Sequence, residues 1–184
     1  MKLRLGLLIL CILMPFVLIG AVNRTVPGAD EMHEPKTIET IIKDLNIGLR
    51  SLDKEIIHLH SLILVETEKM AEDGTDAELN EEIAFMISTF SEVQKSTLRL
   101  QTCVLLITMM PFVEDEHFAG AYHFVKQNNL YHTMIILGSI EISEGNLTEI
   151  SNKKIKKSLV KALKTLSNQV ELIGTLFNTL EGTD

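Results

Sequence analysis

The chain has 184 residues, of which 46% are hydrophobic and 23% are charged, and its formal net charge is −8. This length accommodates one well-buried domain, and the composition is that of a folded protein rather than a disordered one. The negative charge argues against capture of nucleic acid, and the low aromatic content (5%, with no Trp) argues against a base-stacking surface.

The N-terminus is typical of a secretory signal peptide. Lys2 and Arg4 precede an apolar run at residues 5–20, and the small residue Ala21 follows. The alternative is an uncleaved membrane anchor, because a spanning helix needs only about 20 apolar residues. Pro15 interrupts the run and favours cleavage near Ala21. The sequence therefore predicts a secreted, extracellular protein.

Two glycosylation sequons agree with this prediction, whereas the cysteine count is unusual for a small secreted domain. Asn146 begins one sequon, in a polar stretch typical of a loop, and Asn23 begins the other, close to the expected cleavage point. Removal of the signal peptide takes Cys11 away and leaves Cys103 as the single cysteine. An internal disulfide is then excluded, and the apolar neighbours of Cys103 predict a buried structural thiol.

The first predicted helix runs from residue 35 to about Met70. Its apolar residues recur with spacings that alternate between four and three, which is the pattern of a long amphipathic helix. An acidic stretch that contains a Gly ends it. The apolar seam consists of Ile38, Ile42, Leu45, Leu49, Leu52, Ile56, Leu59 and Ile63.

A second helix is predicted from the capping-box pattern at Thr75 to the proline at position 111. Its last part, within Gln101–Val113, is apolar on more than one side. A stretch this short does not span a bilayer, so we expect it to be buried core. The seam consists of Leu79, Ile83, Met86, Phe90, Val93, Thr97, Leu100, Val104 and Ile107.

Two more helices complete the chain. The third, from about Phe118 to Ile142, has the weakest periodicity, and a break is expected at Asn128–Asn129. The fourth follows the loop at Asn146. No stretch shows sustained alternation with period two, so no sheet is expected. The seam of the fourth helix consists of Leu159, Leu163, Leu166, Val170, Ile173, Phe177 and Leu180.

Short connections decide the topology. Consecutive helices joined by short turns lie antiparallel, so the sequence predicts an all-α, up-down-up-down four-helix bundle with long heptad-patterned helices. The predicted organisation is a signal peptide at residues 1–21, a flexible segment at 22–34 and the bundle domain at 35–184.

Two Glu-x-x-His quartets raise the question of a di-iron site, since some four-helix bundles bind iron through such residues. Glu55 and His58 flank the seam of the first helix and are expected to face solvent. Glu114 and His117 lie in the turn after the second helix, where no core carboxylate is available as a partner. We therefore expect no metal and no cofactor. No nucleophile is paired with a base, so an enzyme is not expected either.

Two surface features are candidates for partner binding. Aromatic residues gather between positions 112 and 131, either as packed core or as a recognition surface. The candidate residues there are Phe118, Tyr122, His123 and Tyr131. A run without acidic residues forms either a solvated helix face or a basic strip that meets an acidic partner. This strip consists of Lys153, Lys154, Lys156, Lys157, Lys161 and Lys164.

Two functions from different classes fit these features. The first is a secreted, glycosylated bundle that binds an extracellular or cell-surface protein as a signal or modulator. The alternative is an extracellular carrier of a lipid or other apolar ligand, for which the bundle's Met residues would make an adaptable lining. The seams are mostly Ile, Leu and Val, which pack densely and disfavour a carrier. Self-association through heptad faces is compatible with both.

Overall fold

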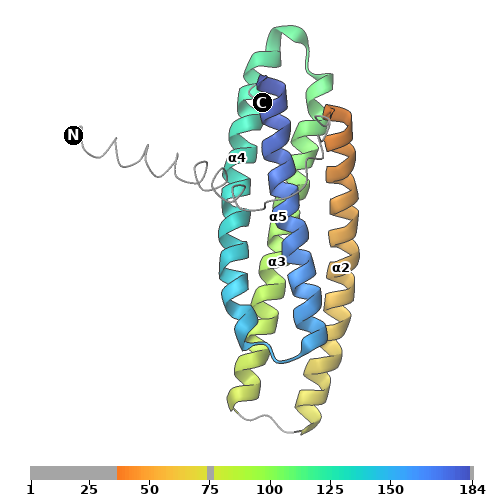
Figure 1. The fold of residues 1–184 in the computed structure, drawn as a ribbon, viewed down its shortest axis with the longest axis vertical. Helices are drawn as coiled ribbons and strands as arrows, with labels where there is room; N and C mark the ends of the chain where they lie inside the picture. Colours follow the sequence, from red (N-terminus) through yellow and green to blue (C-terminus); the bar gives the residue numbers. More distant parts are fainter. Residues whose placement is uncertain (1–36, 74–76, 183–184) are drawn as a thin grey trace, which may run out of the picture. The chain divides into compact units, whose positions relative to one another are not determined.

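The computed structural model describes residues 37–73 and 77–182, which fold into four long antiparallel helices (Figure 1). No strand is present in these two ranges, so the predicted all-α, up-down-up-down bundle is confirmed. The predicted signal peptide, the segment at 22–34 and Asn23 lie outside the described residues. The helices are α2 (Ile38–Asp73), α3 (Ala77–Met109), α4 (Asp115–Asn146) and α5 (Lys153–Glu181).

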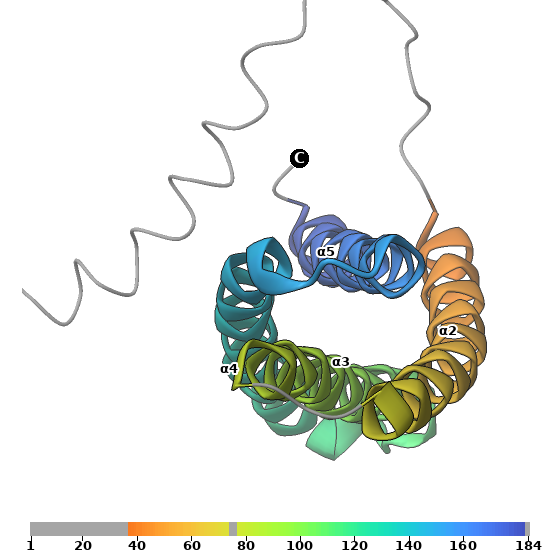
Figure 2. The same ribbon diagram turned by 90° about the horizontal axis from the view of Figure 1, so that it is seen from below.

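Seen end-on, the four helices form a ring (Figure 2), and α3 and α5 also contact one another across it. The order around the ring is α2, α3, α4 and α5, and the closest pairings are α2 with α5 and α3 with α4. Short 3-10 turns, η1 (Met110–Phe112) and η2 (Leu147–Glu149), lead into α4 and α5. None of the four helices combines the length and apolarity needed to cross a membrane.

The predicted seams of α3 and α5 contribute a large share of the core. In α3, every seam position from Met86 to Ile107 is buried, including the polar Thr97. Ile83 is partly buried. In α5, every seam position from Leu159 to Phe177 is buried, whereas Leu180 is exposed. A one-sided apolar pattern was sufficient to identify these faces.

In α2 the buried face overlaps the predicted seam only in part, because Leu45, Leu52, Leu59 and Ile63 of that seam are buried and the others are not. The core face includes Gly48 and Glu55, neither of which an apolar pattern detects. Of the predicted positions, three are only partly buried: Ile42, Leu49 and Ile56. The fully buried side chains of this helix are Ile41, Leu45, Leu52 and Leu59.

Gly48 allows a close approach between α2 and α5. A Cβ at this position would lie 2.2 Å from the Cδ and Nε2 atoms of Gln169. Gln169 is itself buried, so its side chain occupies the space that a larger residue at position 48 would need. The absence of a side chain at Gly48 therefore sets the packing at this level of the bundle.

Glu55 corrects the prediction that this carboxylate faces solvent, because it is only 7% exposed. Ser158 and Lys161 of α5 each donate a hydrogen bond to it. Burial raises the pKa of Glu55, but these two hydrogen bonds more than offset burial and hold the pKa below its usual value. Lys161 of the predicted basic strip thus joins α5 to α2. His58 is exposed, as predicted.

α4 is longer than predicted and unbroken, so the predicted break at Asn128–Asn129 is wrong. The side-chain amides of both residues donate to backbone carbonyls one turn earlier, at 3.3 Å for Asn128 and 2.9 Å for Asn129. These bonds keep both residues within a continuous helix. Asn146 is the last residue of α4 rather than part of a loop, because the helix continues for four residues beyond Ile142.

α4 also has an unusual division between core and surface. Its buried positions include four polar residues: Asn129, Thr133, Ser139 and Ser143. Its exposed positions include five large apolar or aromatic residues: Phe118, Phe124, Tyr131, Met134 and Ile142. This mixture on both faces explains why α4 had the weakest periodicity in the sequence.

The expectation that Gln101–Val113 is core is correct for only one face. Cys103, Val104 and Ile107 are buried, but Leu105 and Met109 are exposed on the opposite side of α3. No other helix of the ring covers that side (Figure 2). Cys103 is a free, buried thiol, as predicted, and burial raises its pKa to about 12.

Candidate binding pocket at one end of the bundle

An apolar pocket of about 340 Å³ opens at the end of the bundle where α2 begins and α5 ends. All four helices and the turn η1 contribute to its walls. Only two lining residues, Tyr122 and Glu181, carry a polar side-chain group. The apolar lining consists of Ile38, Ile42, Ile107, Met110, Pro111, Phe118, Val125, Leu176, Phe177 and Leu180.

The pocket exists because the core seams of the helices are not closed at this end. Ile38 and Leu180 were predicted as core positions, yet they are 37% and 45% exposed and line the pocket. Deeper in the bundle, Leu45, Leu100 and Leu166 are fully buried. The pocket is therefore confined to the end of the bundle and does not continue as a channel along its axis.

One wall of the pocket is aromatic. Phe118 and Tyr122, one helical turn apart on α4, are stacked with their ring centroids 6.5 Å apart. Tyr122 meets Phe177 of α5 edge-to-face at 6.1 Å. Such contacts hold large rings in fixed positions, so this wall is preorganised.

The polar edge of the pocket is a three-residue network between α4 and α5. The Tyr122 hydroxyl donates to Oε1 of Glu181 at 3.0 Å, and Lys126 donates to the same oxygen. Burial and the bond to Glu181 raise the pKa of Tyr122, and the bonds from Lys126 and Tyr122 lower the pKa of Glu181. At neutral pH the carboxylate is thus ionised and the phenol neutral.

The structure brings together only part of the predicted partner-binding set. Phe118 and Tyr122 lie in the pocket wall. His123 is exposed outside the lining, and Tyr131 lies on the outer surface of α4, where its ring meets His132 at 5.5 Å. Sequence analysis did not identify Glu181 as a site residue, since a lone acid near the end of a helix carries no pattern. Ile38 and Leu180 were detectable as seam positions, but only as core.

The predicted basic strip begins at the opposite end of the bundle, at the start of α5. Lys161 is committed to Glu55, and Lys156 is partly buried. The other four are exposed: Lys153, Lys154, Lys157 and Lys164. The strip is therefore separate from the pocket, and its binding to an acidic partner stays a prediction.

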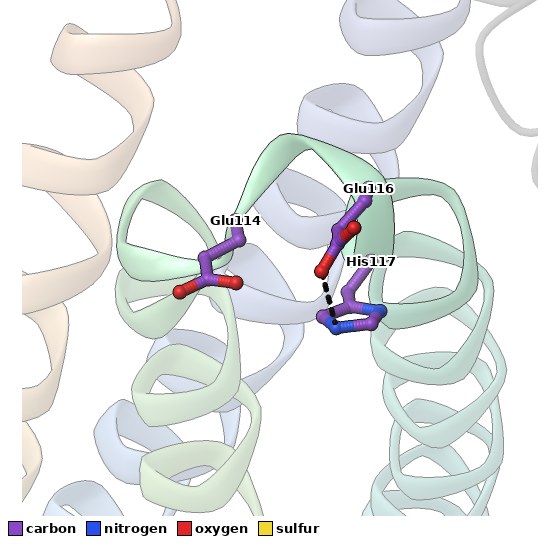
Figure 3. Close-up of side chains that lie close together, drawn as sticks. All are labelled: Glu114, Glu116 and His117. Atoms are coloured by element: carbon purple, nitrogen blue, oxygen red, sulfur yellow. Dashed lines mark ion pairs between the residues drawn. The ribbon is translucent and has the colours of Figure 1, made fainter.

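Glu114, Glu116 and His117 form the one cluster of potential metal ligands in the described part of the chain (Figure 3). Their ligand atoms lie within 4.8 Å of one another, and His117 Nε2 lies 3.2 Å from Glu116 Oε1. All three side chains are exposed at the start of α4, and Glu114 approaches from the other side of the turn (Figure 3). These residues could hold a cation only through mobile surface groups, without the buried supporting contacts that a strong site needs.

Comparisons of this chain with protein-family models, with curated proteins and with solved structures find no match.

Proposed function

We propose that this chain is an extracellular binding protein that holds an apolar group of a partner protein in the pocket at the end of the bundle. The pocket itself is the observation that supports this function most directly. Phe112, beside Pro111 in the turn η1, is 87% exposed, and Phe118 in the pocket wall is also exposed. Apolar side chains around an open pocket are typical of recognition sites rather than of surfaces that remain in water.

The extracellular location rests on the sequence. The basic and apolar N-terminus and the two sequons favour secretion. Asn146, at the end of α4 that lies away from the pocket, is the proposed glycan site. A glycan there would leave the pocket accessible.

The size of the pocket favours a side chain or a short segment of a partner as the occupant. At about 340 Å³, it is near the lower limit of ligand pockets, roughly 300–1,000 Å³. Because the core below it is closed, a long acyl chain would leave much of its length in water. A partner protein would instead insert an apolar anchor and cover the exposed rings around the mouth.

The test is a charge placed at the mouth of the pocket. Leu180→Lys puts an ammonium group among apolar walls, whereas the control Ile57→Lys makes the same change at an exposed residue of α2 outside the pocket. Proteins captured from extracellular medium by the original chain and by the control, but lost with Leu180→Lys, would be pocket-dependent partners. Equal capture by all three proteins would contradict the proposal.

A second candidate, a carrier of a small apolar molecule, is favoured by the almost entirely apolar lining. Native mass spectrometry of the secreted protein distinguishes the two functions. A single small molecule bound at near-equal stoichiometry, which stabilises the fold as its concentration rises, would replace the first proposal with this one. Protein without such a molecule supports the partner-binding function.

A further inference from the structure

A second heptad seam runs along the outside of α4. Its positions alternate in spacing between four and three, as in a helix that packs against another helix. Phe124, Tyr131 and Ile142 on this seam are 57%, 62% and 62% exposed. We call it the outer α4 seam, and it consists of Phe124, Asn128, Tyr131, Ile135, Gly138 and Ile142.

The outer α4 seam is distinct from the face of α4 that enters the core. The core face contains Asn129, Ile136 and Ile140, which are buried within the bundle. The bundle covers only the core face of α4. The outer α4 seam is a second, largely apolar face that the bundle leaves uncovered. An added Cβ at Gly138 would meet nothing within 4 Å, so packing inside the bundle does not require glycine there.

Charge is nearly absent along this face. None of the six seam positions is charged over a length of about 27 Å. Between Phe124 and Ile142, α4 carries only two charged residues, Lys126 and Glu141. Lys126 is directed to Glu181 of α5, away from the seam. The surface is thus a long neutral strip on a chain whose net charge is −8.

We infer that the outer α4 seam binds a second copy of this chain, with the two α4 helices antiparallel about a two-fold axis near Thr133. Two copies that each carry −8 repel one another, and a neutral strip is the face through which they can approach. A two-fold interface must also be complementary to itself, and a heptad seam meets that condition. This inference concerns a different face from the pocket and does not depend on the proposed function.

The antiparallel register pairs residues of complementary size. With the axis near Thr133, Phe124 lies opposite Ile142 of the second copy, and Tyr131 lies opposite Ile135. Asn128 then lies opposite Gly138, so that the amide side chain of the seam faces the residue that has no side chain. A parallel arrangement would instead place Asn128 against Asn128 and leave a gap between the two glycines.

The expected dimer is reversible. One helix face about 27 Å long and about 10 Å wide covers roughly 300 Å² per copy, whereas stable interfaces use about 800 Å² per partner. The interface must therefore extend onto α3, which packs beside α4 and exposes Leu98, Leu105 and Met109. A membrane surface is a poorer occupant, because the strip lacks the Lys and Arg flanks that bind anionic lipids.

Sedimentation of the full chain over a range of concentrations tests the dimer. We expect a concentration-dependent shift from monomer to dimer, which Tyr131→Lys abolishes by burying a charge in the seam and placing two like charges close to the axis. The control Ile57→Lys changes an exposed residue of α2 in the same way and should leave the dimer intact. Circular dichroism should show unchanged helix content in both variants. A wild-type chain that stays monomeric throughout, or a Tyr131→Lys variant that still dimerises, would overturn the inference.

Cysteine cross-linking tests the antiparallel register, because Cys103 is buried and unreactive in the folded chain. Phe124→Cys and Ile142→Cys should cross-link when mixed, but neither should cross-link with itself, since their copies lie at opposite ends of the seam. Met134→Cys, next to the axis, should cross-link with itself. Efficient self-linking of Phe124→Cys and Ile142→Cys separately would overturn the antiparallel arrangement.

Discussion

α5 and α4 are neighbours of similar length that divide their residues between core and surface in opposite ways. α5 buries mostly aliphatic side chains between Ile155 and Phe177, with Ser158 and Gln169 as its buried polar residues, and presents lysines to solvent. α4 buries hydroxyls and an amide and presents aromatic and aliphatic groups to solvent. α5 is therefore held by burial inside this chain, whereas much of the apolar surface of α4 remains to be covered by other molecules.

Hydrogen bonding sharpens this contrast. The buried polar groups of α5 include Ser158, which bonds to Glu55 of α2. Between α3 and α4, Ser139 donates to Glu92 at 3.0 Å. On α4, Oδ1 of Asn129, Nδ1 of His132 and the hydroxyl of Ser143 are buried without a hydrogen-bond partner among the described residues, whereas on α5 only Oε1 of Gln169 is. Since an unpaired buried polar group costs about 1–3 kcal/mol, α4 gains less from its place in the core than α5 does.

The largest expected difference comes from truncating one apolar residue in each helix. Leu166→Ala on α5 removes a fully buried side chain and should lower the free energy of unfolding by about 2–5 kcal/mol. Ile142→Ala on α4 removes an exposed side chain and should change it by less than about 0.5 kcal/mol. Chemical denaturation at high dilution, where the chain is monomeric, measures both. Similar losses of unfolding free energy in the two variants would contradict this contrast, because they would show that Ile142 stabilises the monomer as much as Leu166 does.

A smaller effect, opposite in sign, is expected at the buried amide of α4. Oδ1 of Asn129 has no hydrogen-bond partner among the described residues, and the side chain is fully buried. Asn129→Leu should therefore raise the free energy of unfolding by about 1 kcal/mol. Ser158→Ala on α5 should lower it, because Glu55 loses a donor. A destabilised Asn129→Leu variant would mean that the amide makes a necessary contact.

The smallest expected effect is a pH dependence of the free energy of unfolding, which arises from the contact between Glu55 of α2 and its hydrogen-bond donors on α5. The pKa of Glu55 is lowered in the folded chain, so its ionised form contributes stability above the usual Glu value of about 4.3. This contribution should be lost as the pH falls through the folded pKa below that value. Glu55→Gln should consequently be less stable than the original chain at pH 7, with the gap narrowing toward pH 3. A gap that stays constant in thermal melts across this range would contradict the role of the ionised carboxylate.

Sequence patterns predicted correctly the helices whose buried face follows the apolar periodicity. In α3 and α5, most positions of the predicted seams are buried, so these seams and the topology followed directly from the apolar pattern. In α2, Gly48 and Glu55 enter the core because they contact residues of α5: Gln169 lies against Gly48, and Ser158 and Lys161 bond to Glu55. The sequence of α2 alone does not predict these contacts. In α4, buried polar residues and exposed apolar ones weakened the periodicity, so its two faces could not be separated before packing was known.

The pocket was missed for a different reason. Periodicity places Ile38 and Leu180 correctly on the inward faces of their helices, but it does not show whether the inward space at the end of a bundle is filled. That depends on how far each helix extends and on where Pro111 ends α3, which the contacts of all four helices decide together. The aromatic residues were noticed in the sequence, but only Phe118 and Tyr122 share this site.

The first residue of α2 and the last residue of α5 lie at the same end of the bundle. This has a practical consequence for handling the protein. Ile38 begins α2, Glu181 ends α5, and both line the pocket. An affinity tag or fusion joined directly after Gly182, where a left-handed turn (φ 64°) closes α5, would start beside the pocket mouth and compete with a partner. A tag inserted in the connection at 147–152 would lie at the far end. Immobilisation there would leave the pocket free for binding measurements.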